Sequence, residues 1–427
     1  MSFETQSSKY QPIEAVPSIY KASLDNARAQ IYNLEPEPEP ESSSDNRPVK
    51  CEPDPYAELE QKVIDEVNKA KLQHPEIPAK KEGDEQTMFF FTDRAPIQDS
   101  QGNITGFSKA LDGNPPFPPH FGLVEIDRPG VMPKFSAPGN EVAQNPHSPN
   151  SLIQKIYQDK DEFNEAVYKA TRHSTAHKAI VYNQGFATSF ENASATAAAI
   201  QKACKEEGMN IPVIVYSPPS RDAMRLSQYD ADEESFQRSL MVNGVPIIGN
   251  LERKCESKNM IYIAHSMGNQ NETEYSWSRK GEGLIKPMYA QFSCRSDTDG
   301  HLVAQRIKQY AASARHNIFY YSGDDKALHI SGSLIHNNKR TGNYAGELLK
   351  ASKETPGLEL IDDTSDNNGT TDHVIVPKNI AKRLREMLIA DGEVTEGELA
   401  KNKSDWFKPV PTVPSFDYLD QGTGGCP

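Results

Sequence analysis

The chain has 427 residues, of which 36% are apolar, and a formal net charge of −14 at pH 7. This length and apolar share predict one large domain with additional segments outside its core. The negative charge repels phosphate backbones, and no basic patch with interleaved aromatic residues offsets it, so nucleic-acid binding is disfavoured.

Five cysteines are scattered along the sequence without a CxxC pair: Cys51, Cys204, Cys255, Cys294 and Cys426. This spacing indicates neither a zinc site nor a disulfide framework, so we expect no metal and no cofactor. The N-terminal sequence has no apolar region typical of a signal peptide, and no segment reaches the roughly 18 apolar residues of a membrane span. We therefore expect a cytoplasmic protein without a transmembrane segment, with secretion without a cleavable signal peptide as the alternative.

Three regions are predicted from composition. Residues 1–86 are expected to be a disordered linker, because the Pro/Glu/Ser run at 35–45 cannot bury apolar surface, and to include a short amphipathic helix at 56–72. Such a linker is a possible docking segment for a protein partner. The folded domain is expected at 87–391, followed by a flexible acidic and Pro-rich tail at 392–427.

Short apolar segments alternate with helical segments through the folded domain. Strands are predicted at 88–94, 122–126, 178–183, 211–217, 260–265, 317–322 and 358–362. Helices are predicted at 151–170 with Ser151 as the N-cap, at 189–208 with Gly208 as the stop signal, at about 227–241, and at 377–390. This α/β alternation predicts a mostly parallel sheet flanked by helices, with the chemistry at the carboxyl ends of the strands.

The strongest local signal is IYIAHSMGN at residues 261–269. Its apolar strand leads directly into Ser266, which is the strand–turn shape of a nucleophile elbow. That turn requires small residues two positions before and two after the nucleophile, and Ala264 and Gly268 occupy these positions. An ordinary strand end that contains a serine and a glycine is the alternative interpretation.

A nucleophilic serine needs an imidazole to accept its proton and a carboxylate to orient that imidazole. In folds that carry a nucleophile elbow at the end of a parallel strand, the acid and then the histidine follow the serine along the chain. The candidates after the strand at 317–322 are Asp324 and Asp325, then His329, His336 and His373. His329 is too close in sequence to the acid to reach over Ser266, and His336 lies at the far end of the same segment. His373 lies between the last strand and the last helix, where this fold places its histidine.

The oxyanion of such a reaction is stabilised by backbone N–H groups. We expect one from Met267 and the other from Phe186 or Gln184, in a loop where Gly185 allows close approach. Residues expected to contact the substrate are Gly185, Ser220, Arg221 and His265. For the turn that carries Ser220 and Arg221, a rigid surface turn is the alternative.

Ten ordered segments carry a wider resemblance: FFFTDR, FGLVEIDRP, VYNQGFATSFENA, VIVYSPPSR, YDADEES, AHSMGN, RSDTDGHLV, YYSGDDKALHIS, KRTGN and IDDTS followed by DH. In these segments, which span about 87–376, the chain resembles an uncharacterised bacterial α/β-hydrolase family labelled domain of unknown function 900. The segment AHSMGN is identical to the elbow of that family. The resemblance implies an α/β-hydrolase fold.

The resemblance also implies roles for single residues. It implies Ser266 as the nucleophile, Asp325 rather than Asp324 as the acid, and His373 as the base. Asp297 and Asp299 match paired aspartates of the family, and we expect them to be structural or cleft-lining. Two departures stand out: Gln184 replaces a histidine before the oxyanion glycine, and Pro218 replaces a tryptophan.

The sequence therefore predicts a serine hydrolase of the esterase or lipase-like type, which cleaves an ester, thioester or lipid-like acyl bond of a small-molecule or lipid-like substrate through an acyl-enzyme. A catalytically retired hydrolase fold that acts as a binding protein is the main alternative. Acyl transfer to an acceptor other than water is a third possibility.

Overall fold

The computed structural model describes residues 85–108, 118–127, 151–220, 229–270, 287–364, 373 and 375–406, with short gaps at 306, 326–327, 330, 333–335, 337–338 and 344–345. All of these residues belong to one compact unit within Asp54–Pro427. The helix expected at 56–72 and the remainder of the expected N-terminal linker before residue 85 lie outside the described residues.

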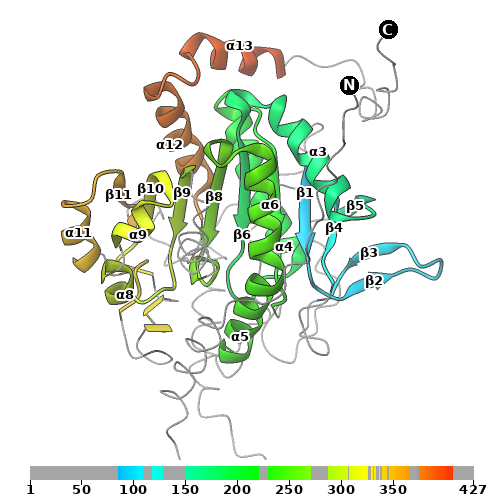
Figure 1. The fold of residues 1–427 in the computed structure, drawn as a ribbon, viewed down its shortest axis with the longest axis horizontal. Coiled ribbons are helices and arrows are strands. Elements are labelled where there is room, and N and C mark those ends of the chain that lie inside the picture. The colour runs from blue at the N-terminus through cyan, green and yellow to red at the C-terminus, as the bar shows by residue number, and fades with distance from the viewer. Residues whose placement is uncertain are drawn as a thin grey trace, which may run out of the picture. The chain divides into compact units, whose positions relative to one another are not determined.

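A nine-stranded sheet forms the centre of the domain, in the order β11-β10-β9-β8-β6-β7-β1-β4-β5 (Figure 1). Neighbouring strands from β11 to β1 run parallel, whereas β4 pairs antiparallel with β1 and with β5. The strands are β1 Gln86–Thr92, β4 His120–Ile126, β5 Ser151–Ile156, β6 Ala179–Asn183, β7 Val213–Tyr216, β8 Met260–His265, β9 Met288–Cys294, β10 Ala314–Tyr321 and β11 Leu358–Asp362. A separate hairpin consists of β2 Pro96–Gln98 and β3 Ile104–Phe107. The predicted mostly parallel sheet is confirmed.

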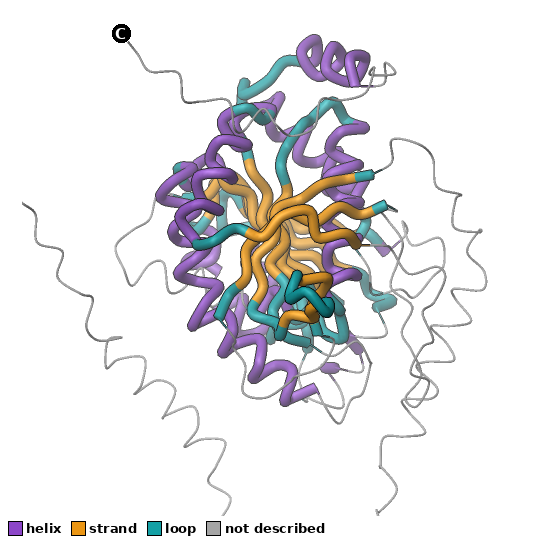
Figure 2. The backbone as a smooth tube through the Cα atoms, turned by 90° about the vertical axis from the view of Figure 1, so that its right-hand side faces the viewer, coloured by secondary structure: helices purple, strands orange, loops and turns teal. Residues whose placement is uncertain are grey.

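Helices cover both faces of this sheet, and Figure 2 shows the strands between two helical layers. The helices are α3 Lys160–Arg172, α4 Phe190–Glu206, α5 Tyr229–Ser239, α6 Val245–Cys255, α8 Gly300–Gln305, α9 Ile307–Ala311, α11 Gly346–Ser352, α12 Pro377–Ala390 and α13 Glu396–Trp406. A π-helical turn at Leu240–Gly244 joins α5 to α6. Within the described residues, no helix combines the length and the apolar character needed to cross a bilayer.

The alternation of side chains along each strand divides the core into two apolar layers. On one face, Ile261 and Ile263 of β8 pack with α4 and α12. On the other face, Tyr262 and Ala264 of the same strand pack with α3 and α6. Both layers consist mainly of fully buried residues. Because such cores are closely packed, they hold the central strands, and with them the carboxyl ends of those strands, in fixed positions.

The prediction of a helix at 151–170 was wrong at its N-terminal end. Ser151–Ile156 is the edge strand β5, and α3 begins only at Lys160. Asp159 rather than Ser151 is the N-cap, because its side chain accepts hydrogen bonds from the backbone N–H groups of Asp161 and Glu162. The sequence pattern favours a helix over a strand at these residues, because β5 is short and none of its residues is fully buried.

Strand β9 was not predicted, although all of its residues are buried. Two polar residues, Gln291 and Ser293, interrupt its apolar pattern. Both find partners inside the fold: Gln291 Oε1 accepts from the hydroxyl of Ser313 at 2.5 Å, and the Ser293 hydroxyl contacts that of Tyr310. Such satisfied polar groups are tolerated in a buried strand, but they hide the strand from a hydropathy pattern.

The first part of the region expected to be a flexible tail forms helix α13. Leu399 of this helix is 2% exposed and belongs to the apolar layer that contains α4 and α12. The end of α4 fits closely against it, because a Cβ atom added to Gly208, which has φ +83°, would lie 2.3 Å from the Leu399 carbonyl oxygen. Residues 407–427 lie outside the described part of the chain.

Replacing Leu399 with alanine tests whether α13 is part of the folded domain. We expect the free energy of unfolding to fall by about 2–5 kcal/mol, because the truncation leaves a cavity in a closed apolar layer. Denaturant unfolding monitored by circular dichroism measures the change. The control Lys403→Ala alters an exposed residue of the same helix and should stay within about 0.5 kcal/mol of the parent. Equal stability of the two variants would contradict the packing of α13.

Candidate active site

Ser266 follows β8 directly and has a φ of 53°, in the left-handed region that residues other than glycine seldom adopt. Its backbone N–H donates to the carbonyl of Cys294 at the end of β9, at 3.0 Å. Its own carbonyl accepts from the backbone N–H groups of Asn269 at 3.0 Å and Asp297 at 3.2 Å. These bonds hold the strained turn in place, which is the geometry expected of a nucleophile elbow.

The elbow lies directly against the loop that follows β6. A Cβ atom added to Gly268 would lie 2.3 Å from the carbonyl oxygen of Gln184, and one added to Gly185 would lie 2.8 Å from Cβ of Ser266. Both glycines are therefore required by close packing rather than by a positive φ. This contact brings the predicted oxyanion loop next to the predicted nucleophile.

Asp325 follows β10 and its side chain is fully buried. His373 Nδ1 lies 2.7 Å from Asp325 Oδ2, and Asp325 Oδ1 accepts from the backbone N–H of Leu328 at 3.0 Å. Asp324, the other candidate acid, is exposed. Of the two predicted carboxylates, Asp325 is thus the one that the structure joins to His373.

The imidazole of His373 lies at the carboxyl end of β8. Its ring centroid is 4.8 Å from that of His265, the residue immediately before Ser266. Burial first, and then the electrostatic interactions with His373 and Arg295, hold the pKa of His265 well below its usual range. His265, which we expected to contact the substrate, is therefore a neutral imidazole packed against His373.

The oxyanion loop is braced by the side chain of Gln184, which is fully buried. Gln184 Nε2 donates to the carbonyls of Thr188 at 3.2 Å and Pro218 at 3.1 Å, and its Oε1 accepts from the Ser217 hydroxyl at 2.8 Å. The side chain thereby ties the loop after β6 to the turn after β7. The remaining predicted donor of this loop, Phe186, packs against Met267 and Tyr229.

Arg94, at the end of β1, is a residue that motif reasoning did not assign to the site. It is 1% exposed, and its guanidinium donates to the carbonyls of Thr188 at 2.6 Å and Ser220 at 2.8 Å. A third bond reaches the Ser217 hydroxyl at 3.1 Å. The sequence around Arg94 gives no clear local signal, because the carbonyls that pair its buried charge belong to loops after β6 and β7.

Ser220 and Arg221 were expected to line the substrate cleft. Ser220 is fully buried, and its hydroxyl donates to Asp232 Oδ2 at 3.0 Å. The structure therefore gives Ser220 a role in holding the turn after β7 against α5. Arg221 lies outside the described residues.

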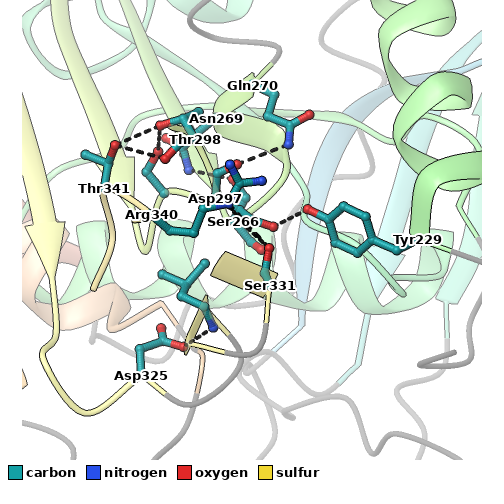
Figure 3. A network of polar contacts seen from close by, with 12 residues as sticks. Tyr229, Ser266, Asn269, Gln270, Asp297, Thr298, Asp325, Ser331, Arg340 and Thr341 are labelled. Carbon is teal, nitrogen blue, oxygen red and sulfur yellow. Dashed lines mark hydrogen bonds and ion pairs between the residues drawn. The ribbon is translucent and has the colours of Figure 1, made fainter. Parts of the chain in front are cut away.

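Asp297 is the centre of a buried polar network beside the elbow (Figure 3). Its Oδ1 accepts from Arg340 Nε at 2.7 Å and from the Ser331 hydroxyl at 2.8 Å, and its Oδ2 accepts from the Tyr229 hydroxyl. Burial alone would raise the pKa of Asp297, but the Arg340 charge and the two hydroxyls outweigh it, so the pKa is lowered. The carboxylate therefore stays ionised and links α5 to the segment that follows Asp325.

The backbone of Asp297 also supports the elbow. Its N–H donates to the carbonyl of Ser266, and its carbonyl accepts from Gln270 Nε2 at 3.1 Å. Asp299, the second of the paired aspartates, accepts the backbone N–H of His301 at 2.8 Å in the first turn of α8. In the structure both aspartates make supporting contacts within the fold.

Glu233 of α5 was also missed by motif reasoning. Burial and, next, the negative charge of Asp297 raise its pKa to about 7. A carboxyl group that holds its proton near neutral pH is a feature of functional sites more often than of ordinary surfaces. No local pattern marks Glu233, because its environment depends on Asp297, a residue distant in the sequence.

The raised pKa of Glu233 predicts a pH-dependent stability. The folded state binds the proton more tightly than the unfolded state, so stability is lost as the pH rises from about 4.5 to about 7. Glu233→Gln should remove this loss and exceed the parent in stability by about 1–3 kcal/mol at pH 8, with little difference at pH 4.5. Thermal unfolding across this pH range measures the effect. The exposed neighbour variant Glu234→Gln should follow the parent at every pH, and a Glu233→Gln curve parallel to the parent would refute the assignment.

Comparisons with known proteins come from sequence and from structure. Residues 159–379 match the family described as "Alpha/beta hydrolase of unknown function (DUF900)". No curated protein matches the sequence. The matched range contains Ser266, Asp325 and His373.

Similar solved structures include three esterases. A hyperthermophilic esterase from the archaeon Pyrobaculum calidifontis is 10% identical with a TM-score of 0.32, covering 88% of this chain and 99% of its own. An esterase from the fungus Rhizomucor miehei is 8% identical with a TM-score of 0.34, covering 84% of this chain and 94% of its own. An arylesterase is 11% identical with a TM-score of 0.31, covering 87% of this chain and 98% of its own.

Proposed function

Because this chain belongs to the α/β hydrolases of unknown function labelled DUF900, we propose that it is a serine hydrolase that cleaves an ester, thioester or lipid-like acyl bond. The observation that carries the proposal is the 2.7 Å contact between His373 Nδ1 and Asp325 Oδ2. It lies at the sheet edge where Ser266 holds a φ of 53°. A buried carboxylate on one imidazole nitrogen leaves the other nitrogen available as a base.

The proposed reaction proceeds in two halves. Ser266 Oγ attacks the acyl carbonyl carbon while His373 Nε2 takes the hydroxyl proton, and Asp325 holds the imidazole in the required tautomer. The bond to the leaving group breaks, and His373 returns the proton to that group. Water then attacks the acyl-enzyme with His373 as the base, which releases the acid and restores the Ser266 hydroxyl.

The backbone N–H groups of Met267 and Phe186 are the proposed donors to the oxyanion. Two buried side chains support this assignment, since Gln184 and Arg94 both bind the carbonyl of Thr188 within the same loop. Donors held in this way need no reorganisation when charge develops on the substrate. The loop is therefore suited to transition-state stabilisation.

An apolar wall beside the nucleophile supports an acyl substrate. Phe186, Tyr229 and Met267 form a cluster in which the Phe186 and Tyr229 rings are 5.0 Å apart. Phe186 is only half-buried, so part of its ring remains available for contact. An aromatic surface next to the reacting serine favours an apolar acyl group over a small polar one.

Replacing Ser266 with alanine tests the nucleophile. We expect loss of labelling by a fluorophosphonate probe, and a fall in kcat/KM for short p-nitrophenyl esters of about 10⁴- to 10⁶-fold. The control Ser352→Ala, in α11, should label and turn over as the parent does. Unchanged turnover by Ser266→Ala would rule out Ser266 as the nucleophile. A parent protein that neither labels nor turns over any ester would instead favour a retired hydrolase fold that acts as a binding protein.

Replacing Gln184 with alanine tests the brace of the oxyanion loop. We expect kcat to fall by about 10- to 100-fold with little change in KM, because small displacements of an oxyanion donor act on the transition state more than on substrate binding. Steady-state kinetics with one p-nitrophenyl ester measures both constants. Gln154→Ala, on the exposed edge strand β5, is the matched control. A change confined to KM would assign Gln184 to substrate binding instead.

A further inference from the structure

Arg295 occupies an unusual position directly after β9. Its φ is 48°, so β8 and its neighbour β9 are each followed directly by a left-handed residue other than glycine. The backbone N–H of Arg295 donates to the carbonyl of Tyr320 in β10 at 3.0 Å. Gly342 covers the next peptide bond, because a Cβ atom at Gly342 would lie 2.4 Å from the backbone of Arg295 and of Ser296. The surrounding chain therefore holds Arg295 in a conformation that it would seldom adopt alone.

The guanidinium of Arg295 is completely buried. Nη2 lies 3.0 Å from Asp363 Oδ1, whose side chain is 3% exposed. None of the three guanidinium nitrogens has a hydrogen-bond partner among the described residues. Burial of a charge with so few hydrogen bonds opposes folding, and a buried ion pair is weak evidence of a stabilising role. A role of Arg295 in the candidate active site explains its burial better than a contribution to stability does.

The pair lies between the two ends of the segment that carries His373. Asp363 follows β11, at the start of that segment, and its N–H donates to the carbonyl of Tyr321 at 3.1 Å. Ile375 and Val376, at the other end, line a narrow cavity together with Arg295 and Asp363. The Arg295 side chain therefore lies near described residues at both ends of the segment.

The charge of Arg295 also acts on His265, one of the two imidazoles of the site. It is one of the causes that lower the pKa of His265, after burial and the electrostatic interaction with His373. The ring of His265 in turn packs against that of His373. The titratable groups in contact with the His373 imidazole are Asp325, which follows β10, and His265 at the end of β8, while Arg295 after β9 pairs with Asp363 after β11.

We propose that Arg295, paired with Asp363, is a positioning residue that holds the His373 segment over Ser266 and balances the charge around its imidazole. This role rests on the proposed function, in which His373 is the base. Arg295 fixes where the segment starts and where it enters α12, so the imidazole keeps its contact with Asp325. With Asp363 beside it, the guanidinium adds no net charge to the part of the site in which the imidazolium forms during the reaction.

The double variant Arg295→Met/Asp363→Leu separates positioning from stability. Replacing both members of a buried pair by apolar groups of similar size is expected to leave the thermal midpoint close to that of the parent. If the pair positions His373, kcat for a p-nitrophenyl ester falls about tenfold or more while KM changes little. A folded double variant with the kcat of the parent would overturn the proposal.

The single variants test the charge balance by an observation that needs no turnover. Full-length protein labelled with ¹³C at histidine Cε1 is titrated by NMR, with the His373 signal identified through its loss in His373→Asn. Arg295→Met leaves the Asp363 charge alone and should move the titration midpoint upward by about half a pH unit or more. Asp363→Asn leaves the Arg295 charge alone and should move the midpoint downward.

The control is Arg315→Met, which breaks the ion pair of Arg315 Nη2 with Asp391 Oδ1, 2.7 Å apart and beyond the end of α12. It should leave the His373 midpoint unchanged. Midpoints that shift in the same direction in both single variants, or in neither, would overturn the charge balance; if a single variant does not fold, the kinetics of the double variant decide. Failure of the proposed function appears separately, as a parent protein without turnover or probe labelling.

Discussion

The hydrogen bonds that hold the backbone of Ser266 in a left-handed conformation are the constraint on which the site depends. A serine at a φ of 53° is stable only because the carbonyl of Cys294 takes its N–H, and because Asn269 and Asp297 bind its carbonyl. Those partners come from the adjacent strand end and from the turn itself. The position of Ser266, the proposed nucleophile, is thus set by the register of β8 against β9.

Buried polar groups surround this turn in three separate arrangements. Arg94 and Gln184 hold the loop after β6, Asp297 links α5 to the segment after β10, and Arg295 pairs with Asp363 directly after β11. Each arrangement joins loops that leave different strands, so each fixes one wall of the site relative to another. The first two arrangements are hydrogen-bonded networks, which cost desolvation but specify one geometry, whereas the Arg295 guanidinium forms an ion pair with Asp363 without a hydrogen bond among the described residues.

What the sequence predicts correctly here follows from local requirements. A tight turn after an apolar strand demands small residues such as Ala264 and Gly268. The expected chain order of an acid and a histidine led to Asp325 and His373, which lie in contact in the structure, while their catalytic roles belong to the proposal. Contacts between segments that are distant in the sequence produce no local sequence pattern from which they could be predicted. Arg94 and Glu233 are assigned only once their partners are known, and β9 is hidden by Gln291 and Ser293, whose polarity is neutralised by residues outside the strand.

The π-helical turn between α5 and α6 determines which side of α5 faces the site. An extra residue in a helical turn rotates everything beyond it by about 100° relative to an uninterrupted helix. The buried face of α6 includes Leu251 and Ile247. If α5 continued the regular helical periodicity of α6, Glu233 would lie on this buried face and Asp232 would point away from it. With the π turn, Asp232 is the buried one and Glu233 is left at the margin of the buried face. Removing a single residue from Leu240–Gly244 would therefore bury Glu233 and expose Asp232. The charge on this side of α5 would change although no residue of α5 had been replaced.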